Sequence, residues 1–162
     1  MRKGFSSYDS GLMFYSAFEL LFQKYILSRA VGDCKGMLLV IPALVNGSFA
    51  CELFLKALLA KPTRGHRLYS DLYCKLDSRT ASEIEHKVID HFKNEKNTII
   101  DSGQFRLNFM AEEKDFEELR YFYEPGKPGE EKSYNVDFVT VLVRSVYKEL
   151  HADHETGAAD NK

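Results

Sequence analysis

The sequence lacks the features that mark most secreted, membrane-spanning and disulfide-rich proteins. Its three cysteines are odd in number and show no close paired spacing, which argues against a disulfide framework, a zinc knuckle or a redox motif. The N-terminus shows no apolar core followed by a small-residue cleavage site, so nothing indicates export. The longest unbroken apolar run, Met37 to Val45, is far shorter than the ~20 residues of a membrane span. These absences predict a cytoplasmic protein with reduced thiols and no membrane partner.

The motifs of several enzyme classes are missing as well. There is no glycine-rich phosphate loop and no serine nucleophile motif, and His151 with His154 makes only a weak metal pair, so neither a cofactor nor a metal site is expected. A net charge of -2 gives no overall attraction to nucleic acid, although a local basic patch remains open. The 162 residues, 44% of them hydrophobic and 28% charged, suit one soluble globular domain.

Apolar residues recur at intervals of three and four along most of the chain, which is the period of one helical face. The pattern predicts a first helix from about Tyr8 to Arg29, a very apolar second helix between Met37 and Ala60, and a closing helix that carries Val139 to Leu150. Shorter periodic segments fill the middle of the chain, among them a short amphipathic helix predicted at about residues 66–76. We therefore expect an all-α bundle of five or six helices formed by residues 1–150, followed by a disordered tail at 151–162.

Local signals refine the ends of these helices. Pro42 is expected in the first turn of the second helix or at a kink in it. Thr80 with Glu83 three residues on predicts a capping box, and Asn135 or Asp137 can cap the closing helix.

The apolar helix between Met37 and Ala60 contains only two charges, Glu52 and Lys56, four residues apart. An ionised side chain in an apolar surround is costly unless it is paired, so the spacing predicts an ion pair on one helical face. The usual role of such a pair is structural. The alternative is a polar pocket in which the carboxylate acts as an acceptor or base and the ammonium binds a phosphate.

Two further groups of residues are candidates for binding or chemistry. His66 stands at a predicted helix start, where a histidine commonly caps or packs but where an imidazole can also perform acid-base work. Arg120 and Glu124 lie four residues apart and enclose Tyr121 and Tyr123. An arginine among aromatic rings can stack on bases and bind phosphate, although such residues more often serve the core or a helix end.

Three pieces taken together resemble a HEPN domain: the Glu52-x-x-x-Lys56 helix, the turn Gly65-His66-Arg67-Leu68, and the segment Phe116–Glu124. The resemblance covers about residues 46–124. It implies an α-helical bundle that forms a homodimer. Many members of that family cut RNA as toxins or defence nucleases, and others are non-catalytic partners of minimal nucleotidyltransferases.

Catalytic HEPN members typically carry an arginine followed, after four to six residues, by a histidine, and two such pairs meet across the dimer as a metal-independent ribonuclease site. The place that the resemblance assigns to this arginine is Arg120, and no histidine follows it. Arg144 and His151 do have this spacing, and they return to nearly the same helical face, but short matches of this kind arise by chance. Relative to the apolar stripe of this helix, both are expected to point away from the core. They can line a dimer groove or contact a phosphate, whereas a charged helix exterior is usually solvated.

The leading hypothesis from the sequence is a HEPN-like binding or regulatory module for RNA or a nucleotide. One alternative is a divergent endoribonuclease of a toxin-antitoxin or defence system, in which Arg144 with His151, or His66 with Arg120, supplies the acid-base pair. Another is a structural partner of a nucleotidyltransferase. The residues expected to form a ligand-binding or polar network are Glu52, Lys56, His66, Arg120, Tyr121, Tyr123 and Glu124.

Overall fold

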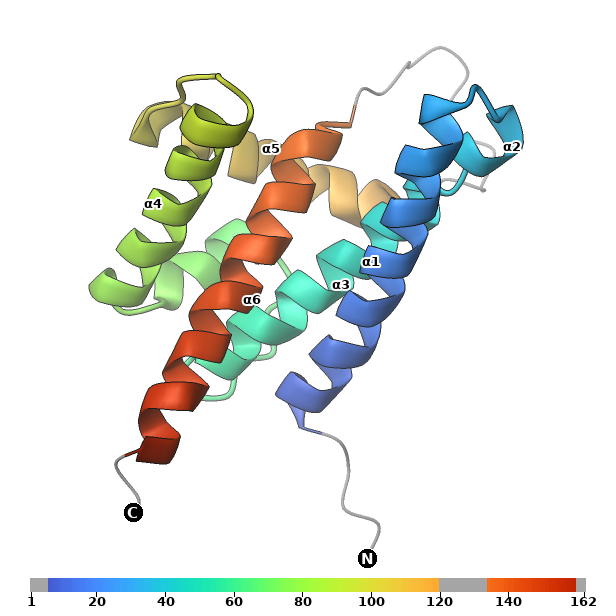
Figure 1. Cartoon of the computed structure of the whole chain (residues 1–162). Coiled ribbons are helices and arrows are strands. Elements are labelled where there is room, and N and C mark those ends of the chain that lie inside the picture. The colour runs from blue at the N-terminus through green and yellow to red at the C-terminus, as the bar shows by residue number, and fades with distance from the viewer. Residues whose placement is uncertain (1–5, 120–133, 160–162) are drawn as a thin grey trace, which may run out of the picture.

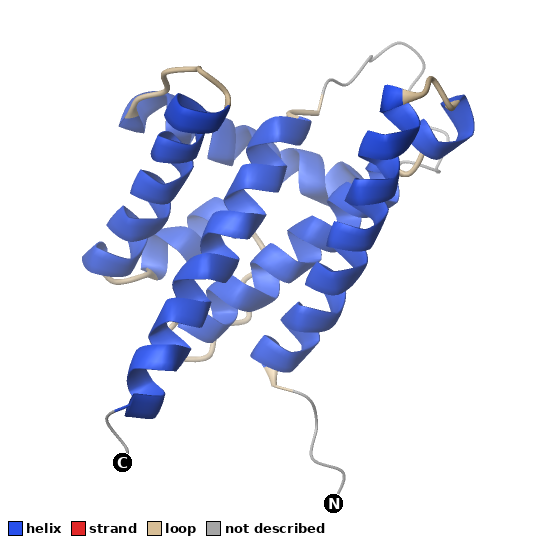
Figure 2. Cartoon of the chain, in the orientation of Figure 1, coloured by secondary structure: helices blue, strands red, loops and turns tan. Residues whose placement is uncertain are grey.

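The structure, a computed structural model, describes residues 6–119 and 134–159 and is built from helices, with no strand in these residues (Figures 1 and 2). This confirms the all-α prediction. The α-helices are α1 (Ser7–Ala30), α2 (Cys34–Met37), α3 (Val40–Leu58), α4 (Ser78–Glu95), α5 (Ser102–Leu119) and α6 (Val136–Ala159). Between α3 and α4 lie a π-helical turn, η1 (Leu68–Leu72), and a 3₁₀ turn, η2 (Tyr73–Lys75).

Helix α3 is the centre of the bundle. It packs mainly against α1 and α6, and also touches η1 and α5. Figure 1 shows α3 passing behind α6 and α1, which lie side by side with a space between them. The sequence of α3 explains this position, because a helix that is apolar on most of its surface must be covered on several sides. Its buried residues are Ala43, Leu44, Gly47, Ser48, Ala50, Cys51, Glu52, Phe54 and Leu55.

Two glycines let α1 and α3 approach closely. A Cβ atom at Gly11 of α1 would lie 2.6 Å from the Phe54 ring of α3, and a Cβ atom at Gly47 of α3 would lie 2.9 Å from the Phe18 ring of α1. Each helix thus presses a fully buried phenylalanine against a glycine of the other. The order of these two contacts along the chain shows that the helices run antiparallel.

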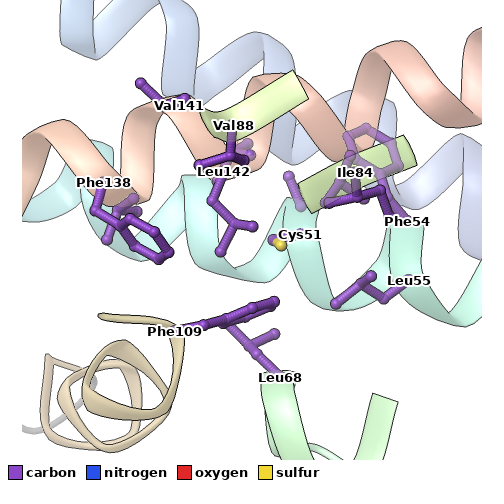
Figure 3. Close-up of a cluster of buried hydrophobic side chains, with 14 of the residues drawn as sticks. Cys51, Phe54, Leu55, Leu68, Ile84, Val88, Phe109, Phe138, Val141 and Leu142 are labelled. Carbon is purple, nitrogen blue, oxygen red and sulfur yellow. The ribbon is translucent and has the colours of Figure 1, made fainter. Parts of the chain in front are cut away.

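Side chains from α3, α4, α5, α6 and η1 meet in one buried cluster. Figure 3 shows Leu142 of α6 beside Val88 of α4; in the same cluster Phe138 of α6 meets Phe109 of α5, with ring centres 6.3 Å apart. Each of these four side chains is almost completely removed from solvent. Interiors packed in this way hold several distant segments of the chain in fixed positions.

The segment Cys34–Leu58 is long and apolar enough to cross a membrane by length and composition, and half of its most apolar window is buried in the bundle. A core helix of a soluble protein passes the same test. The segment includes α3, whose burial against α1 and α6 accounts for its apolar composition. The location of the protein in the cell stays a prediction.

Three details of the predicted helices need correction. The tail expected from His151 onward is helical as far as Ala159, because extending a formed helix costs far less than starting one. Helix α4 begins at Ser78, capped by the Asp77 carboxylate rather than by Thr80. The segment predicted as a short amphipathic helix around residues 66–76 forms the π-helical and 3₁₀ turns instead.

Other local predictions are confirmed. Pro42 lies in the first turn of α3, where its missing amide proton costs no hydrogen bond. The Asn135 side chain accepts a hydrogen bond from the amide of Phe138 at the start of α6. The cysteines are free thiols, of which only Cys51 is buried.

Candidate functional site

The segment of residues 59–67, which joins α3 to η1, is a basic loop. Its cationic residues Lys61, Arg64 and Arg67 are exposed, and so is His66. No aspartate or glutamate occurs between Leu53 and Ser70 in the sequence. No hydrogen bond or ion pair joins the side chains of the three cations to any residue that the structure describes. Among the described residues, the side chains of these three cations therefore remain available to bind an anion.

The C-terminal part of the basic loop is held by a buried carboxylate. Glu52 of α3 is only 4% exposed, and its Oε1 atom accepts a hydrogen bond from Lys56 Nζ at 2.7 Å. The same Oε1 atom lies 2.9 Å from His66 Nδ1. This confirms the predicted ion pair between Glu52 and Lys56 and shows that His66 joins it. Whether these residues also contact a ligand stays a prediction.

The contact with Glu52 fixes the tautomer of His66. An ionised carboxylate can only accept a hydrogen bond. Nδ1 must therefore carry the hydrogen of this contact and donate the hydrogen bond to Oε1. In the neutral ring Nε2 then keeps its lone pair, and the side chain of His66 is 67% exposed. The imidazole is thus held in one orientation and still reachable from solvent.

The η1 turn that follows the basic loop is held by Glu113 of α5. Its carboxylate accepts hydrogen bonds from the backbone amides of Tyr69 at 2.9 Å and Ser70 at 2.7 Å, and from the Ser70 hydroxyl. These amides open the η1 turn and have no partner within it. Gly65 is also required, because a Cβ atom there would lie 2.5 Å from Cβ of Asp71. The C-terminal part of the loop is therefore attached to α3 through His66, and the η1 turn that follows it is attached to α5.

Arg144, predicted as a catalytic candidate, lies elsewhere, between α6 and α1. Its Nε and Nη2 atoms donate to the two carboxylate oxygens of Glu19 at 2.7 and 2.8 Å. Its guanidinium lies 5.5 Å from the ring centre of Phe22. Arg144 thus ties α6 to α1, and the expectation that it points away from the core is wrong in part, because its side chain is only 35% exposed.

His151, the predicted partner of Arg144, contacts a different group. Its ring meets Tyr147 edge-on, with ring centres 5.4 Å apart. Tyr147 in turn stacks on Tyr15 of α1 at 4.3 Å. Seven helical residues rise about 10 Å, so within one chain Arg144 and His151 do not form a preorganised acid-base pair.

Four of the predicted network residues, Arg120, Tyr121, Tyr123 and Glu124, lie outside the described residues. Of the predicted sites, the structure brings together Glu52, Lys56 and His66. Lys61, Arg64, Arg67 and Glu113 were missed. A count of charges over residues 59–67 would have found the three cations. Nothing in the sequence points from Glu113 to an amide more than 40 residues away.

No protein-family model, curated protein or solved structure matches this chain. The residues that the structure describes also hold no group of three or more His, Cys, Asp or Glu side chains placed to bind a metal ion. The chemistry of the site therefore has to be argued from its own geometry.

A groove of about 300 Å³ lies between α4 and α6. His91 lines it together with Lys87, Arg144 and Lys148. Burial lowers the pKa of His91, and the charges of Lys148, Lys96 and Arg144 lower it further, while Glu95 opposes them. Lys87 pairs with Glu149 and Arg144 with Glu19, so much of the positive charge here is already neutralised. The basic loop is therefore the stronger candidate for binding an anion.

The ion pair of Arg144 with Glu19 makes stability depend on pH. Burial raises the pKa of Glu19, but the hydrogen bonds and charge of Arg144, with a hydrogen bond from Tyr15, outweigh burial and lower it overall. A carboxyl whose pKa is lowered by folding stabilises the protein above its ordinary pKa and loses that effect as the pH falls.

We expect Glu19→Gln to lower the free energy of unfolding by about 1 kcal/mol at pH 7, because both groups remain partly exposed. The difference from wild type should shrink as the pH approaches 3, where Glu19 becomes protonated. Urea unfolding at both pH values measures it. Exposed Glu95→Gln is the control and should show little difference at either pH; an unchanged gap for Glu19→Gln would contradict this account of the pair.

Proposed function

We propose that this chain is a HEPN-like, non-catalytic module that binds the phosphates of single-stranded RNA through the basic loop. The observation that carries the proposal is the set of three exposed cations, Lys61, Arg64 and Arg67, without partners among the described residues. Lysine and arginine side chains bind phosphate directly, and such contacts dominate the affinity of proteins for nucleic acid.

The length of the loop supports a chain of phosphates as its ligand. From Lys61 to Arg67 an extended backbone spans at most about 20 Å, enough for several nucleotides of a single strand. The C-terminal part of the loop is attached through His66 to Glu52, and the η1 turn after it is attached to Glu113, which reduces the entropy that this part of the loop loses on binding. A free nucleotide offers the same phosphate chemistry, but it can contact only part of this span.

The contact between His66 and Glu52 is the specific observation in favour of a ribonuclease. A carboxylate that orients an imidazole is the arrangement found beside many general bases. Cleavage, however, needs a second group to protonate the leaving oxygen. The partner that the sequence assigned to His66 is Arg120, which lies outside the described residues, and Arg144 is engaged by Glu19. Binding without cleavage is therefore the function that we propose.

The test is the affinity for a labelled single-stranded RNA of about 16 nucleotides, measured by fluorescence anisotropy. The triple variant Lys61→Gln, Arg64→Gln, Arg67→Gln should bind roughly 30- to 100-fold more weakly than wild type at about 50 mM salt, because three phosphate contacts are lost. The control is Arg29→Gln, Lys35→Gln, Lys93→Gln, which removes the same charge from other exposed positions and should bind like wild type.

Equal weakening in both triple variants would contradict a site at the basic loop. Tighter binding of a nucleoside triphosphate than of the RNA would favour a free nucleotide as the ligand. We expect the RNA to remain intact during the measurement. Cleavage that disappears in His66→Ala would instead support the ribonuclease alternative.

A further inference from the structure

The groove that His91 lines is held between two packed helices. Helices α4 and α6 contact each other and run antiparallel (Figure 1). Lys87 of α4 pairs with Glu149 of α6, and Lys96, just after α4, donates a hydrogen bond at 2.7 Å to Asp137 at the start of α6. These two pairs lie at the two ends of the groove, which is therefore a fixed feature of the bundle.

The groove contains a buried hydroxyl group without a partner. Ser145 of α6 lines the groove and is only 5% exposed, and no hydrogen bond joins its side chain to any residue that the structure describes. A serine or threonine inside a helix commonly bonds the carbonyl four residues earlier, as Thr140 of the same helix does with Val136 at 2.7 Å. A buried hydroxyl that makes no hydrogen bond costs stability, so this group in a groove indicates a ligand that supplies the missing partner.

The two walls of the groove offer unpaired charges of opposite sign. On the α6 side, Lys148 follows Ser145 by three residues, so the two side chains lie on one helical face and can donate to the same group. On the α4 side are the carboxylates of Asp90 and Glu95. Within the part of the chain that the structure describes, no ion pair or hydrogen bond engages the side chain of Lys148, Asp90 or Glu95.

We propose that this groove binds a small zwitterion. Its carboxylate accepts hydrogen bonds from the side chains of Ser145 and Lys148, and such charge-assisted bonds are the stronger kind. Its ammonium group pairs with Asp90 or Glu95. A simple anion would meet the carboxylates of α4, and a simple cation would meet Lys148. Burial holds the pKa of His91 below its ordinary value, so at about pH 7.5 the ring is uncharged and repels neither end of the ligand.

The size of the groove limits the ligand. Its volume is at the lower end of the roughly 300–1,000 Å³ that small-molecule sites have. A water molecule takes up about 30 Å³ of liquid, so the groove has room for roughly ten non-hydrogen atoms. Packed helices have axes about 8–10 Å apart, and a ligand that reaches both walls therefore needs several bonds between its two charged groups. An amino acid with a carbon chain between its ammonium group and its carboxylate meets both requirements.

The first experiment is a titration of the isotope-labelled full chain with 6-aminohexanoate up to about 20 mM, followed by NMR. The backbone amide signals of His91, Asn94 and Ser145 should shift. Hexanoate lacks the ammonium group and hexylamine lacks the carboxylate, so each should bind roughly 5-fold more weakly than the zwitterion. Equal affinity for the three compounds, or no shift of these amides with 6-aminohexanoate, would overturn the proposal.

The second experiment tests the buried hydroxyl. Ser145→Ala should weaken the binding of 6-aminohexanoate by about 10-fold, because a hydrogen bond to a charged group is lost. The unfolding temperature of the free variant should be no lower than that of wild type, since the hydroxyl has no partner in the free protein. Ser82→Ala, at an exposed serine of α4 outside the groove, is the matched control and should bind like wild type. Unchanged affinity in Ser145→Ala would overturn the assigned role of this hydroxyl.

A third variant tests which end of the ligand meets α6. Lys148→Gln should weaken the binding of hexanoate and of 6-aminohexanoate by about 5-fold, but it should not weaken the binding of hexylamine. Weaker binding of hexylamine alone would contradict the proposed orientation. These experiments contain no RNA and leave the basic loop unchanged, so their outcome is independent of the proposed RNA binding.

Discussion

Replacing Phe54 by alanine should lower the free energy of unfolding by about 3–5 kcal/mol. The ring is fully buried where α1, α3 and α6 meet, against Gly11, Tyr15 and Tyr147. Gly11 has no side chain that can move into the cavity, and the surrounding rings are themselves held by stacking. Since small domains are stable by only about 5–15 kcal/mol, this one change should remove a large part of the stability.

Urea unfolding followed by circular dichroism measures this loss. Phe14→Ala is the matched control, because Phe14 lies on the same side of the bundle, is 37% exposed, and stacks on Phe49 with ring centres 5.3 Å apart. Its loss should stay below about 1.5 kcal/mol. Equal losses for the two variants would contradict the close contact of α1 with α3 around Gly11.

Removing the buried carboxylate should have the second large effect. Glu52→Ala leaves the ammonium of Lys56, only 16% exposed, without its acceptor at 2.7 Å. Breaking a buried pair in this way typically costs about 3 kcal/mol, because the remaining charge is no longer compensated. His66→Ala should cost less than about 1 kcal/mol, since the histidine side chain is largely in solvent.

The double variant Glu52→Leu with Lys56→Leu shows whether Glu52→Ala loses stability because a contact is missing or because the charge of Lys56 is left unpaired. Replacing both partners by apolar side chains of similar size is often neutral or stabilising, so the double variant should recover most of the stability lost in Glu52→Ala. Chemical denaturation of the three variants beside wild type is the measurement. A double variant as unstable as Glu52→Ala would show that Glu52 acts mainly through contacts other than Lys56.

The sequence predicted the long helices well because their signals are local. Spacings of three and four along α1 and α6 define a buried face without knowledge of what covers it. The turns around Leu68 to Lys75 were harder, because their backbone is set by Glu113 of α5, a contact that no local pattern records. The cap of α4 was misplaced because Asp77 and Thr80 are both good capping residues, and only the backbone geometry selects the first.

The buried ion pair of the candidate site, Glu52 with Lys56, was predictable from the sequence. Two charges inside an apolar helix must be paired, and Glu52 with Lys56 satisfied that requirement. The position of His66 beside them was not fixed by spacing, since the loop between Lys56 and His66 can take many paths. The contact of Arg144 was not predictable, because its partner, Glu19, is 125 residues away in sequence. Periodicity could place Arg144 on one face of its helix, but it could not show that this face packs against α1.

The measurement that tests the central claim most directly is the salt dependence of RNA binding by wild type and by the basic-loop triple variant. Each phosphate contact to a single strand contributes about 0.7 to the slope of log affinity against log salt concentration. If Lys61, Arg64 and Arg67 each contact a phosphate, the triple variant should have a slope shallower by about 2 than wild type. Identical slopes, with any loss of affinity the same at every salt concentration, would contradict binding of RNA phosphates by this loop.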